Sequence, residues 1–310
     1  MATMHARPSW GAAAGNVVRG ALIGSVEVVP GVSGGTVALI VGIYERIIKS
    51  AGHVVSGVRH IVTDVLRGRG TSAAAAEFRQ ADWGMLIPVA VGMLSALVLA
   101  ASQVEGFVHD HPELARGLFL GLVAGGLVVP ISMVGRRWNG RFVALAAAAG
   151  IAAFVLTGLP PTEVTPSPPI IVVSAAVAVC ALVLPGLSGS FMLLTFGLYE
   201  PTLAAVNDRD FGYLSWFVLG AMIGLALFVR VLQWLLEHRH DATLAVLTGL
   251  MVGGMRALWP WQDDDRSMLA PADHVGGVVL LFVLGATAVL VTLALATRSS
   301  SPKPGAHARR

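Results

Sequence analysis

The sequence predicts an all-α polytopic membrane protein, an inverted repeat in which each half is a re-entrant helical hairpin plus three transmembrane helices. Three observations predict this fold class: an apolar composition, six long apolar stretches, and a Pro-Gly-x-Ser-Gly motif that occurs twice. Of the 310 residues, 55% are hydrophobic and 13% are charged, whereas about a quarter of the residues in an average soluble protein are charged. The composition therefore excludes an ordinary soluble domain.

Two apolar segments are broken near their middle by nearly the same residues. VVPGVSGGTVALIVGIYE begins at Val28, within a segment at about 16–49, and LVLPGLSGSFMLLTFGLYE begins at Leu182, within a segment at about 170–205. Each half has about 13 to 16 residues, roughly 20 to 24 Å at 1.5 Å per residue, which is too short to cross a bilayer. We therefore expect two re-entrant hairpins whose tips lie near the middle of the membrane.

Three crossings follow each hairpin. A helix needs about 20 apolar residues to cross a hydrocarbon core roughly 30 Å thick. Six stretches reach or approach this length: Met85–Val104, Leu114–Val134, Phe142–Gly158, Leu214–Leu235, Leu244–Trp259 and Val275–Ala296.

The two halves are related by constant sequence offsets. Around the motif, equivalent residues such as Pro30 and Pro185 are 155 positions apart, whereas Asp82 and Asp210 are 128 apart. The offset becomes smaller because the second half has fewer residues between the motif and the Asp, and we assign the extra residues of the first half to a longer loop, Gly52–Ala81. The predicted organisation is an N-terminal tail without a signal peptide (1–15), a first repeat (16–158), an extracytoplasmic linker (159–169), a second repeat (170–297) and a basic tail (298–310).

An odd number of crossings in each half predicts that the halves are inverted, as in many secondary transporters. The charges agree with this topology, because 15 of the 21 basic residues fall on one predicted side and most acidic residues on the other. By the positive-inside rule, both termini are expected in the cytoplasm. The net charge of +3 is thus related to topology and does not indicate nucleic-acid binding.

The broken motif has the chemistry of an anion site. Pro30 and Gly31 end one half-helix, and Ser33 is placed to cap the next. Backbone N–H groups without acceptors are costly inside a membrane, and a helix N-terminus attracts anions. The two tips are expected to meet and bind a phosphate or carboxylate. The alternative is a tight helical turn with a Ser cap and no ligand. The candidate residues are Gly31, Ser33, Gly34, Gly35, Thr36, Gly186, Ser188, Gly189 and Ser190.

Three charged residues inside apolar segments are further candidates, because ionisable groups in a membrane are usually functional. Arg19 and Glu27 are eight residues apart and share a helix face, so they are assigned to charge coupling, with a proton or sodium ion, or to head-group pairing. The alternative is that Arg19 reaches the membrane surface and Glu27 pairs with it. Arg256, near the outer end of the fifth crossing, could guide an anion inward.

Enzymatic chemistry is not indicated. A lipid phosphatase needs a nucleophile with a general acid or base, and no His follows Ser33 or Ser188. The single cysteine, Cys180, cannot form an intramolecular disulfide, and the His residues show no metal-ligand spacing. We expect neither catalysis nor a metal or other cofactor.

At the motif residues, VPGVSGGTVALIVGIYE and LPGLSGSFMLLTFGLYE, the chain resembles the bacterial polyprenyl-phosphate transporters of the PopT type, formerly a family of unknown function. The resemblance extends from about residue 16 to the last crossing. It implies a flippase in the bacterial cytoplasmic membrane that returns undecaprenyl phosphate from the outer to the inner leaflet. It also implies that the motif residues bind the lipid. The two copies differ where Phe191 corresponds to Thr36. A transporter or channel for a small anion is the alternative.

Overall fold

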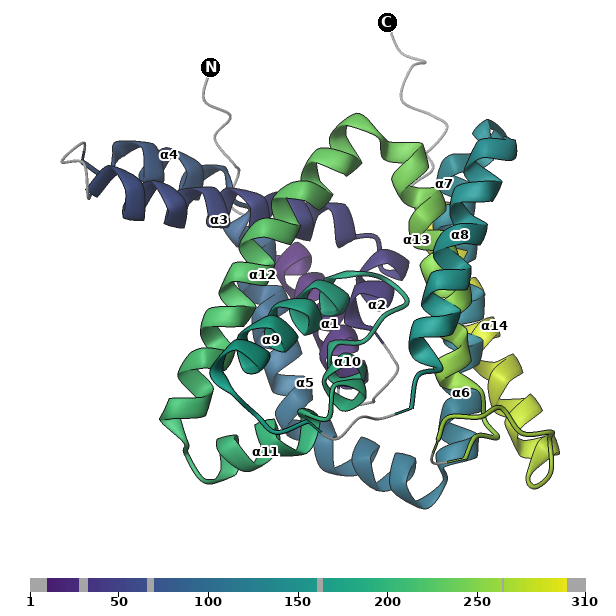
Figure 1. Cartoon of the computed structure of the whole chain (residues 1–310). Helices are drawn as coiled ribbons and strands as arrows, with labels where there is room; N and C mark the ends of the chain where they lie inside the picture. Colours follow the sequence, from purple (N-terminus) through teal and green to yellow (C-terminus); the bar gives the residue numbers. More distant parts are fainter. Residues whose placement is uncertain (1–9, 28–32, 66–69, 161–163, 264, 300–310) are drawn as a thin grey trace, which may run out of the picture.

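The structure is a computed structural model that describes residues 10–27, 33–65, 70–160, 164–263 and 265–299. Within these residues the regular elements are helices, apart from one isolated β-bridge between Gln262 and Met268. The expected all-α polytopic architecture is therefore confirmed for the described chain (Figure 1).

The first half contains α1 (Trp10–Glu27), α2 (Gly34–Ile40), α3 (Tyr44–Val65), α4 (Ser72–Gln80), α5 (Trp83–Asp110), α6 (Pro112–Gly126), α7 (Val128–Val134), η1 (Gly135–Arg137) and α8 (Gly140–Thr157). The second half contains α9 (Pro168–Val183), α10 (Gly189–Thr195), α11 (Tyr199–Asn207), α12 (Phe211–His238), α13 (His240–Gly254), η2 (Met255–Leu258) and α14 (Val275–Ser299).

Five of the six predicted crossings contain helical segments long and apolar enough to span a membrane. These are Pro112–Arg137, Gly140–Thr157, Phe211–His238, His240–Leu258 and Val275–Ala294. The remaining predicted crossing, Met85–Val104, lies within the 28-residue helix α5, whose stretch Trp83–Ala96 is a shorter apolar helix.

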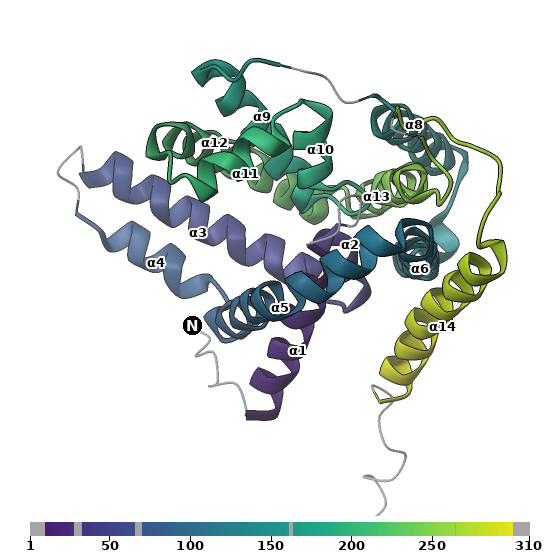
Figure 2. The ribbon, with the colours of Figure 1, turned by 90° about the horizontal axis from the view of Figure 1, so that it is seen from below.

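Helix boundaries differ from the prediction in three places. Helix α1 already begins at Trp10, because an Ala-rich stretch at 12–14 favours helix. The expected loop Gly52–Ala81 is largely helical, since α3 continues to Val65 and α4 follows at Ser72. In Figures 1 and 2 these two helices lie side by side and project from the bundle.

The third difference concerns the helix that follows the break in each broken segment, which is shorter than predicted. Helices α2 and α10 have 7 residues each. They end before Gly42 (φ 73°) and Gly197 (φ 67°), and a positive φ favours glycine and terminates a helix. New helices then begin at Tyr44 and Tyr199.

The repeat seen in the sequence is visible in the helix boundaries. Both ends of α2 and α10 differ by 155 positions, and both ends of α5 and α12, and of α6 and α13, differ by 128. Asp82 and Asp210 occupy the same place in this pattern: each accepts a hydrogen bond from the first turn of its helix, from Met85 N at 3.1 Å and from Tyr213 N at 3.0 Å. The equivalent helices α5 and α12 run in opposite directions in Figure 1.

Four helix pairs pack closely, α1 with α5, α9 with α12, α6 with α14, and α8 with α13, and the first two pairs each include the first helix of a broken segment. Glycines permit the close approach. A Cβ on Gly121 of α6 would overlap the Phe282 carbonyl of α14, and one on Gly249 of α13 would overlap the Ala146 carbonyl of α8. Small residues allow such packing in a membrane, where no hydrophobic force draws helices together.

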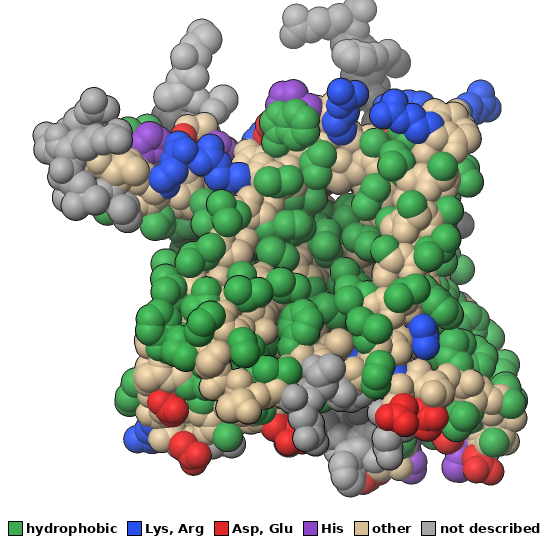
Figure 3. All heavy atoms as spheres, in the orientation of Figure 1, with side chains coloured by type: hydrophobic (Ala, Val, Ile, Leu, Met, Phe, Trp, Pro, Cys, Tyr) green, Lys and Arg blue, Asp and Glu red, His purple; other side chains and the backbone are tan. Residues whose placement is uncertain are grey.

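The surface carries its charges at opposite ends. On the face drawn in Figure 3, most Lys and Arg side chains lie at the upper end, most Asp and Glu side chains lie at the lower end, and a band of hydrophobic side chains lies between them. Only 11% of the α8 span and 17% of the α12 and α14 spans are buried inside the protein. Apolar side chains therefore face outward along these helices, as expected for helices in contact with lipid.

Candidate functional site

The two broken segments meet in the interior. We call residues 28–36, between α1 and the first turn of α2, the first tip, and residues 184–191, between α9 and the first turn of α10, the second tip. Ser33 Oγ donates to the Leu184 carbonyl at 2.9 Å, and the Gly186 amide donates to Thr36 Oγ1 at 2.9 Å. Ser33, Thr36 and Ser188 are buried, with exposed fractions of 2%, 1% and 4%. The described parts of the tips thus form one polar unit.

Glycine is required where the tips touch. A Cβ on Gly35 would lie 2.9 Å from the Val183 carbonyl oxygen, and Gly186 has a φ of 90° and lies against the backbone of Met251. Both positions therefore exclude a side chain for steric reasons. Tyr44 strengthens the same junction, because its hydroxyl donates to the Val183 carbonyl at 3.1 Å.

The two serines of the motif behave differently. Ser188 caps α10 as expected, since its Oγ accepts from Phe191 N at 3.5 Å and lies 2.9 Å from Ser190 Oγ. Ser33 stands at the N-cap position of α2, but its side chain makes no capping hydrogen bond and instead donates to the second tip. The expected side-chain cap at Ser33 was wrong, because the hydroxyl is turned toward the carbonyl of Leu184 and does not accept from the first turn of α2.

The carboxylate of Glu27 lies at the start of α2. Glu27 accepts a hydrogen bond from the Gly34 amide, and a Cβ on Gly34 would overlap Glu27 Oε1. A carboxylate at a helix N-terminus is favourable. A carboxyl group of the protein itself therefore occupies part of the first tip.

The side chain of Arg19 does not lie with Glu27 at the start of α2. Its Nη1 donates to Asn16 Oδ1 at 2.9 Å, and the eight positions from Arg19 to Glu27 correspond to about 12 Å along the helix. The alternative in which Arg19 pairs with Glu27 was wrong, because each side chain has a nearer partner.

The other predicted site residues fall as follows. Gly31, with Pro30, lies outside the described residues. Gly189 is buried against the Ala178 carbonyl. Arg256 is in η2 and contacts α8 rather than either tip: its Nη1 donates to the Phe154 carbonyl at 3.0 Å and its guanidinium lies 4.6 Å from the centre of the Phe154 ring.

One residue that the sequence analysis missed is Arg266, in the loop before α14. Its side chain is buried, with 7% exposed. Nη1 donates to Leu159 O at 2.8 Å and to Thr195 Oγ1 at 2.7 Å, and the guanidinium lies 4.1 Å from the centre of the Phe191 ring. Because Arg266 follows three consecutive Asp residues, its sequence suggests a solvated charge and no local signal reveals the burial.

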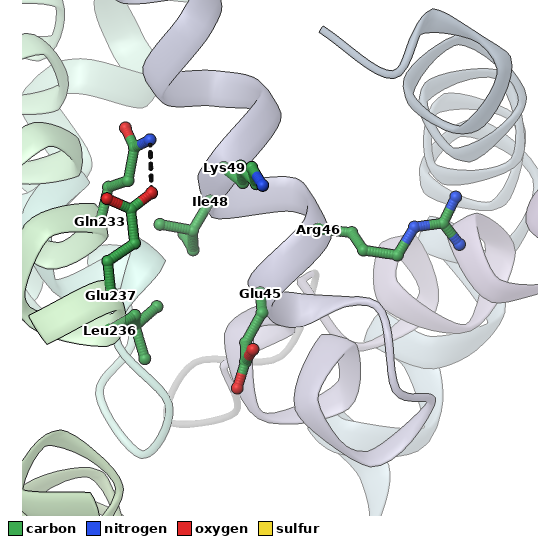
Figure 4. Close-up of a pocket in the computed structure, with 7 residues that line it drawn as sticks. All are labelled: Glu45, Arg46, Ile48, Lys49, Gln233, Leu236 and Glu237. Atoms are coloured by element: carbon green, nitrogen blue, oxygen red, sulfur yellow. Dashed lines mark hydrogen bonds between the residues drawn. The ribbon is translucent and has the colours of Figure 1, made fainter. Parts of the chain in front are cut away.

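A cavity of about 250 Å³, lined by charged and apolar side chains, opens between α3 and α12 (Figure 4). Gln233 donates to Glu237 at 3.1 Å within it, and Glu45 bonds to His240 Nε2 at 2.8 Å. Its walls carry charges of both signs: Glu45, Arg46, Lys49 and Glu237. Because positive and negative side chains are balanced, the walls of this cavity do not favour binding of an anion. The described residues hold no group of three metal-ligating side chains.

Comparison with known proteins gives a consistent result. The model of the VCA0040-like family, described as undecaprenyl phosphate translocase-like, matches residues 23–276. A protein of Vibrio cholerae named polyprenyl-phosphate transporter is 35% identical over 246 residues, covering 79% of this chain and 77% of the relative. One of Staphylococcus aureus with the same name is 28% identical over 267 residues, covering 79% of this chain and 86% of the relative. No solved structure matches significantly.

Proposed function

Because the chain belongs to the undecaprenyl phosphate translocase-like family, we propose that it transports polyprenyl phosphate across a bacterial cytoplasmic membrane. The proposed cargo is undecaprenyl phosphate, moved from the outer to the inner leaflet for reuse as a lipid carrier. The proposed orientation follows the positive-inside rule: the basic end in Figure 3 faces the cytoplasm with both termini, and the acidic end is extracytoplasmic.

The proposed architecture is an inverted repeat with two re-entrant segments. It is supported by the constant offsets between helix boundaries and by the opposite directions of α5 and α12. In such transporters, discontinuous helices from both repeats bind the substrate near the middle of the membrane.

The observation that carries the proposal is the junction of the two tips, Ser33 with Leu184 and Gly186 with Thr36. Irregular backbone is tolerated at such depth only where protein, water or a ligand satisfies it. The first-turn amides of Gly189 and Ser190 have no acceptor within their own helix, and the hydroxyls of Ser188 and Ser190 lie beside them. We assign the phosphate to the two tips: Gly31, Ser33, Gly34, Gly35, Thr36, Gly186, Ser188, Gly189 and Ser190.

Glu27 gives this site a means of charge coupling. A phosphate that approaches Gly34 meets the carboxylate of Glu27, and two anions repel strongly at low dielectric. A proton or sodium ion on Glu27 would remove the repulsion. The coupling ion is therefore proposed to act at Glu27.

Transport is tested in proteoliposomes that contain a fluorescent polyprenyl phosphate, by measuring how much of it becomes accessible to a membrane-impermeant quencher. The double variant Ser33→Ala/Ser188→Ala is expected to lose lipid movement while the wild type retains it. Equal rates in the two proteins would refute the assignment of the tips. Uptake of inorganic phosphate by the same vesicles would favour the small-anion alternative, and release of phosphate from polyprenyl diphosphate would indicate a phosphatase.

A further inference from the structure

Two arginine side chains contact residues at the C-terminal end of α8. A Cβ on Gly158 would overlap the guanidinium carbon of Arg256, and the next residue, Leu159, accepts a hydrogen bond from Arg266 at 2.8 Å. The two guanidinium groups therefore contact adjacent residues, although Arg256 and Arg266 come from different segments, η2 and the loop before α14.

Both arginines retain unused hydrogen-bonding capacity. Within the described residues, Arg256 Nε and Arg266 Nη2 are buried without a partner, and Arg266 is 7% exposed. Their recorded acceptors are uncharged: the carbonyls of Phe154 and Leu159 and the hydroxyl of Thr195. Neither arginine forms an ion pair with a carboxylate in the part of the chain that the structure describes. Two neighbouring, unneutralised cations repel each other, and an anion between them would offset this cost.

An apolar groove leads away from the same place. It has a volume of about 470 Å³ and runs between α8 and α13, lined by residues that include Ala147, Ile151, Val252 and Phe154. Ile151 of α8 and Val252 of α13 are 66% and 50% exposed, so the groove is open at the protein surface. Phe154 belongs both to the groove and to the surroundings of Arg256. The groove therefore reaches the surroundings of Arg256.

We infer that Arg256 and Arg266 bind the phosphate of the lipid at the extracytoplasmic face, and that the α8–α13 groove holds the first part of its isoprenoid chain. The inference rests on the proposed function and extends it by a capture site separate from the tips. A guanidinium matches the oxygens of a phosphate by paired, charge-assisted hydrogen bonds. An apolar chain with one anionic end fits a groove that ends beside Arg256, with Arg266 bound to the same end of α8.

The capture site lies beside the second tip. Arg266 contacts Thr195 and Phe191 of α10, whose N-cap is Ser188. A phosphate that binds Arg266 would thus be one short helix from the hydroxyls of Ser188 and Ser190. This arrangement gives the lipid a path from the outer leaflet to the tips.

The test measures binding of farnesyl phosphate, a short isoprenoid monophosphate, to the full chain in nanodiscs of neutral lipid. We expect Arg256→Gln and Arg266→Gln each to weaken binding about tenfold or more, because each removes a charge-assisted hydrogen bond. Arg209→Gln, which removes a cation from the exposed turn between α11 and α12, is the control and should bind like the wild type. Farnesol should bind equally to all four proteins, which also reports that the variants are folded.

The groove is tested with Val252→Trp, which fills it, against Val279→Trp on α14, where Val279 is 54% exposed. Only Val252→Trp should weaken binding of farnesyl phosphate and farnesol. If the wild type binds farnesyl phosphate and transports lipid while the Gln variants bind with unchanged affinity, the capture site is refuted and the proposed function stands. If the wild type neither binds nor transports, both are refuted.

Discussion

The Gly186 amide donates a hydrogen bond of 2.9 Å to Thr36 Oγ1, across 150 positions of the chain. This contact joins the two copies of a repeated motif at residues that do not correspond, because Thr36 aligns with Phe191. The tips are thus complementary rather than identical. In this contact the first tip supplies a side-chain acceptor and the second a backbone donor.

Replacing Thr36 by Val should weaken the contact between the two tips. The substitution preserves shape but leaves the Gly186 amide without its acceptor, which costs about 1 to 3 kcal/mol. We expect a lower thermal midpoint in detergent and slower lipid transport. Thr36→Ser should keep both. The control is Thr248→Val: Thr248 is also buried, but its hydroxyl bonds only to Leu244 of its own helix, so a smaller loss is expected. Equal losses at Thr36 and Thr248 would contradict the role of the junction.

Replacing Glu27 by Gln should remove the dependence of transport on pH. Gln keeps an oxygen that can accept from Gly34 but carries no charge, so it does not repel phosphate. In the wild type, transport should fall as pH rises, because the deprotonated carboxylate competes with the phosphate. The rate of lipid movement is measured in vesicles across a range of pH, with equal pH on both sides. A Gln variant that keeps the wild-type profile would exclude Glu27 as the coupling residue.

Replacing Gly186 by Ala should destabilise the protein. Gly186 has a φ of 90° and a Cβ there would lie 2.5 Å from Met251 Cα, so strain and overlap act together, at about 2 kcal/mol or more. Gly15→Ala is the matched control, since nothing lies within 4 Å of the added Cβ, and in α1 it should stabilise slightly. Thermal midpoints compare the two. An unchanged midpoint for Gly186→Ala would mean that the second tip can relax freely.

Replacing Asp210 by Ala should weaken the start of α12. Its Oδ1 accepts from Tyr213 N at 3.0 Å, and loss of such a cap costs about 1 kcal/mol. Asp208→Ala removes an exposed carboxylate two residues earlier and should have little effect. The comparison is made by thermal unfolding, and similar midpoints for the two variants would show that the cap does not contribute.

Much of the architecture follows from the sequence alone. Apolar stretches, the breaks at Pro and Gly, and the offsets of 155 and 128 are properties of consecutive residues, and the helix boundaries repeat with the same offsets. The prediction was less accurate where an amphipathic segment is helical without being apolar, as in α3, and where a single glycine ends a helix, as at Gly42.

The partners of the functional candidates were decided only by the tertiary structure. Nothing local determines that Ser33 bonds to Leu184 or that the Arg266 side chain, in an acidic loop, lies over the Phe191 ring. A buried polar group bonds to whatever the fold places within about 3 Å. For Ser33 and Arg266 those neighbours lie 151 and 71 residues or more away. Sequence pattern determined which segments enter the membrane, and packing determined which polar groups meet there.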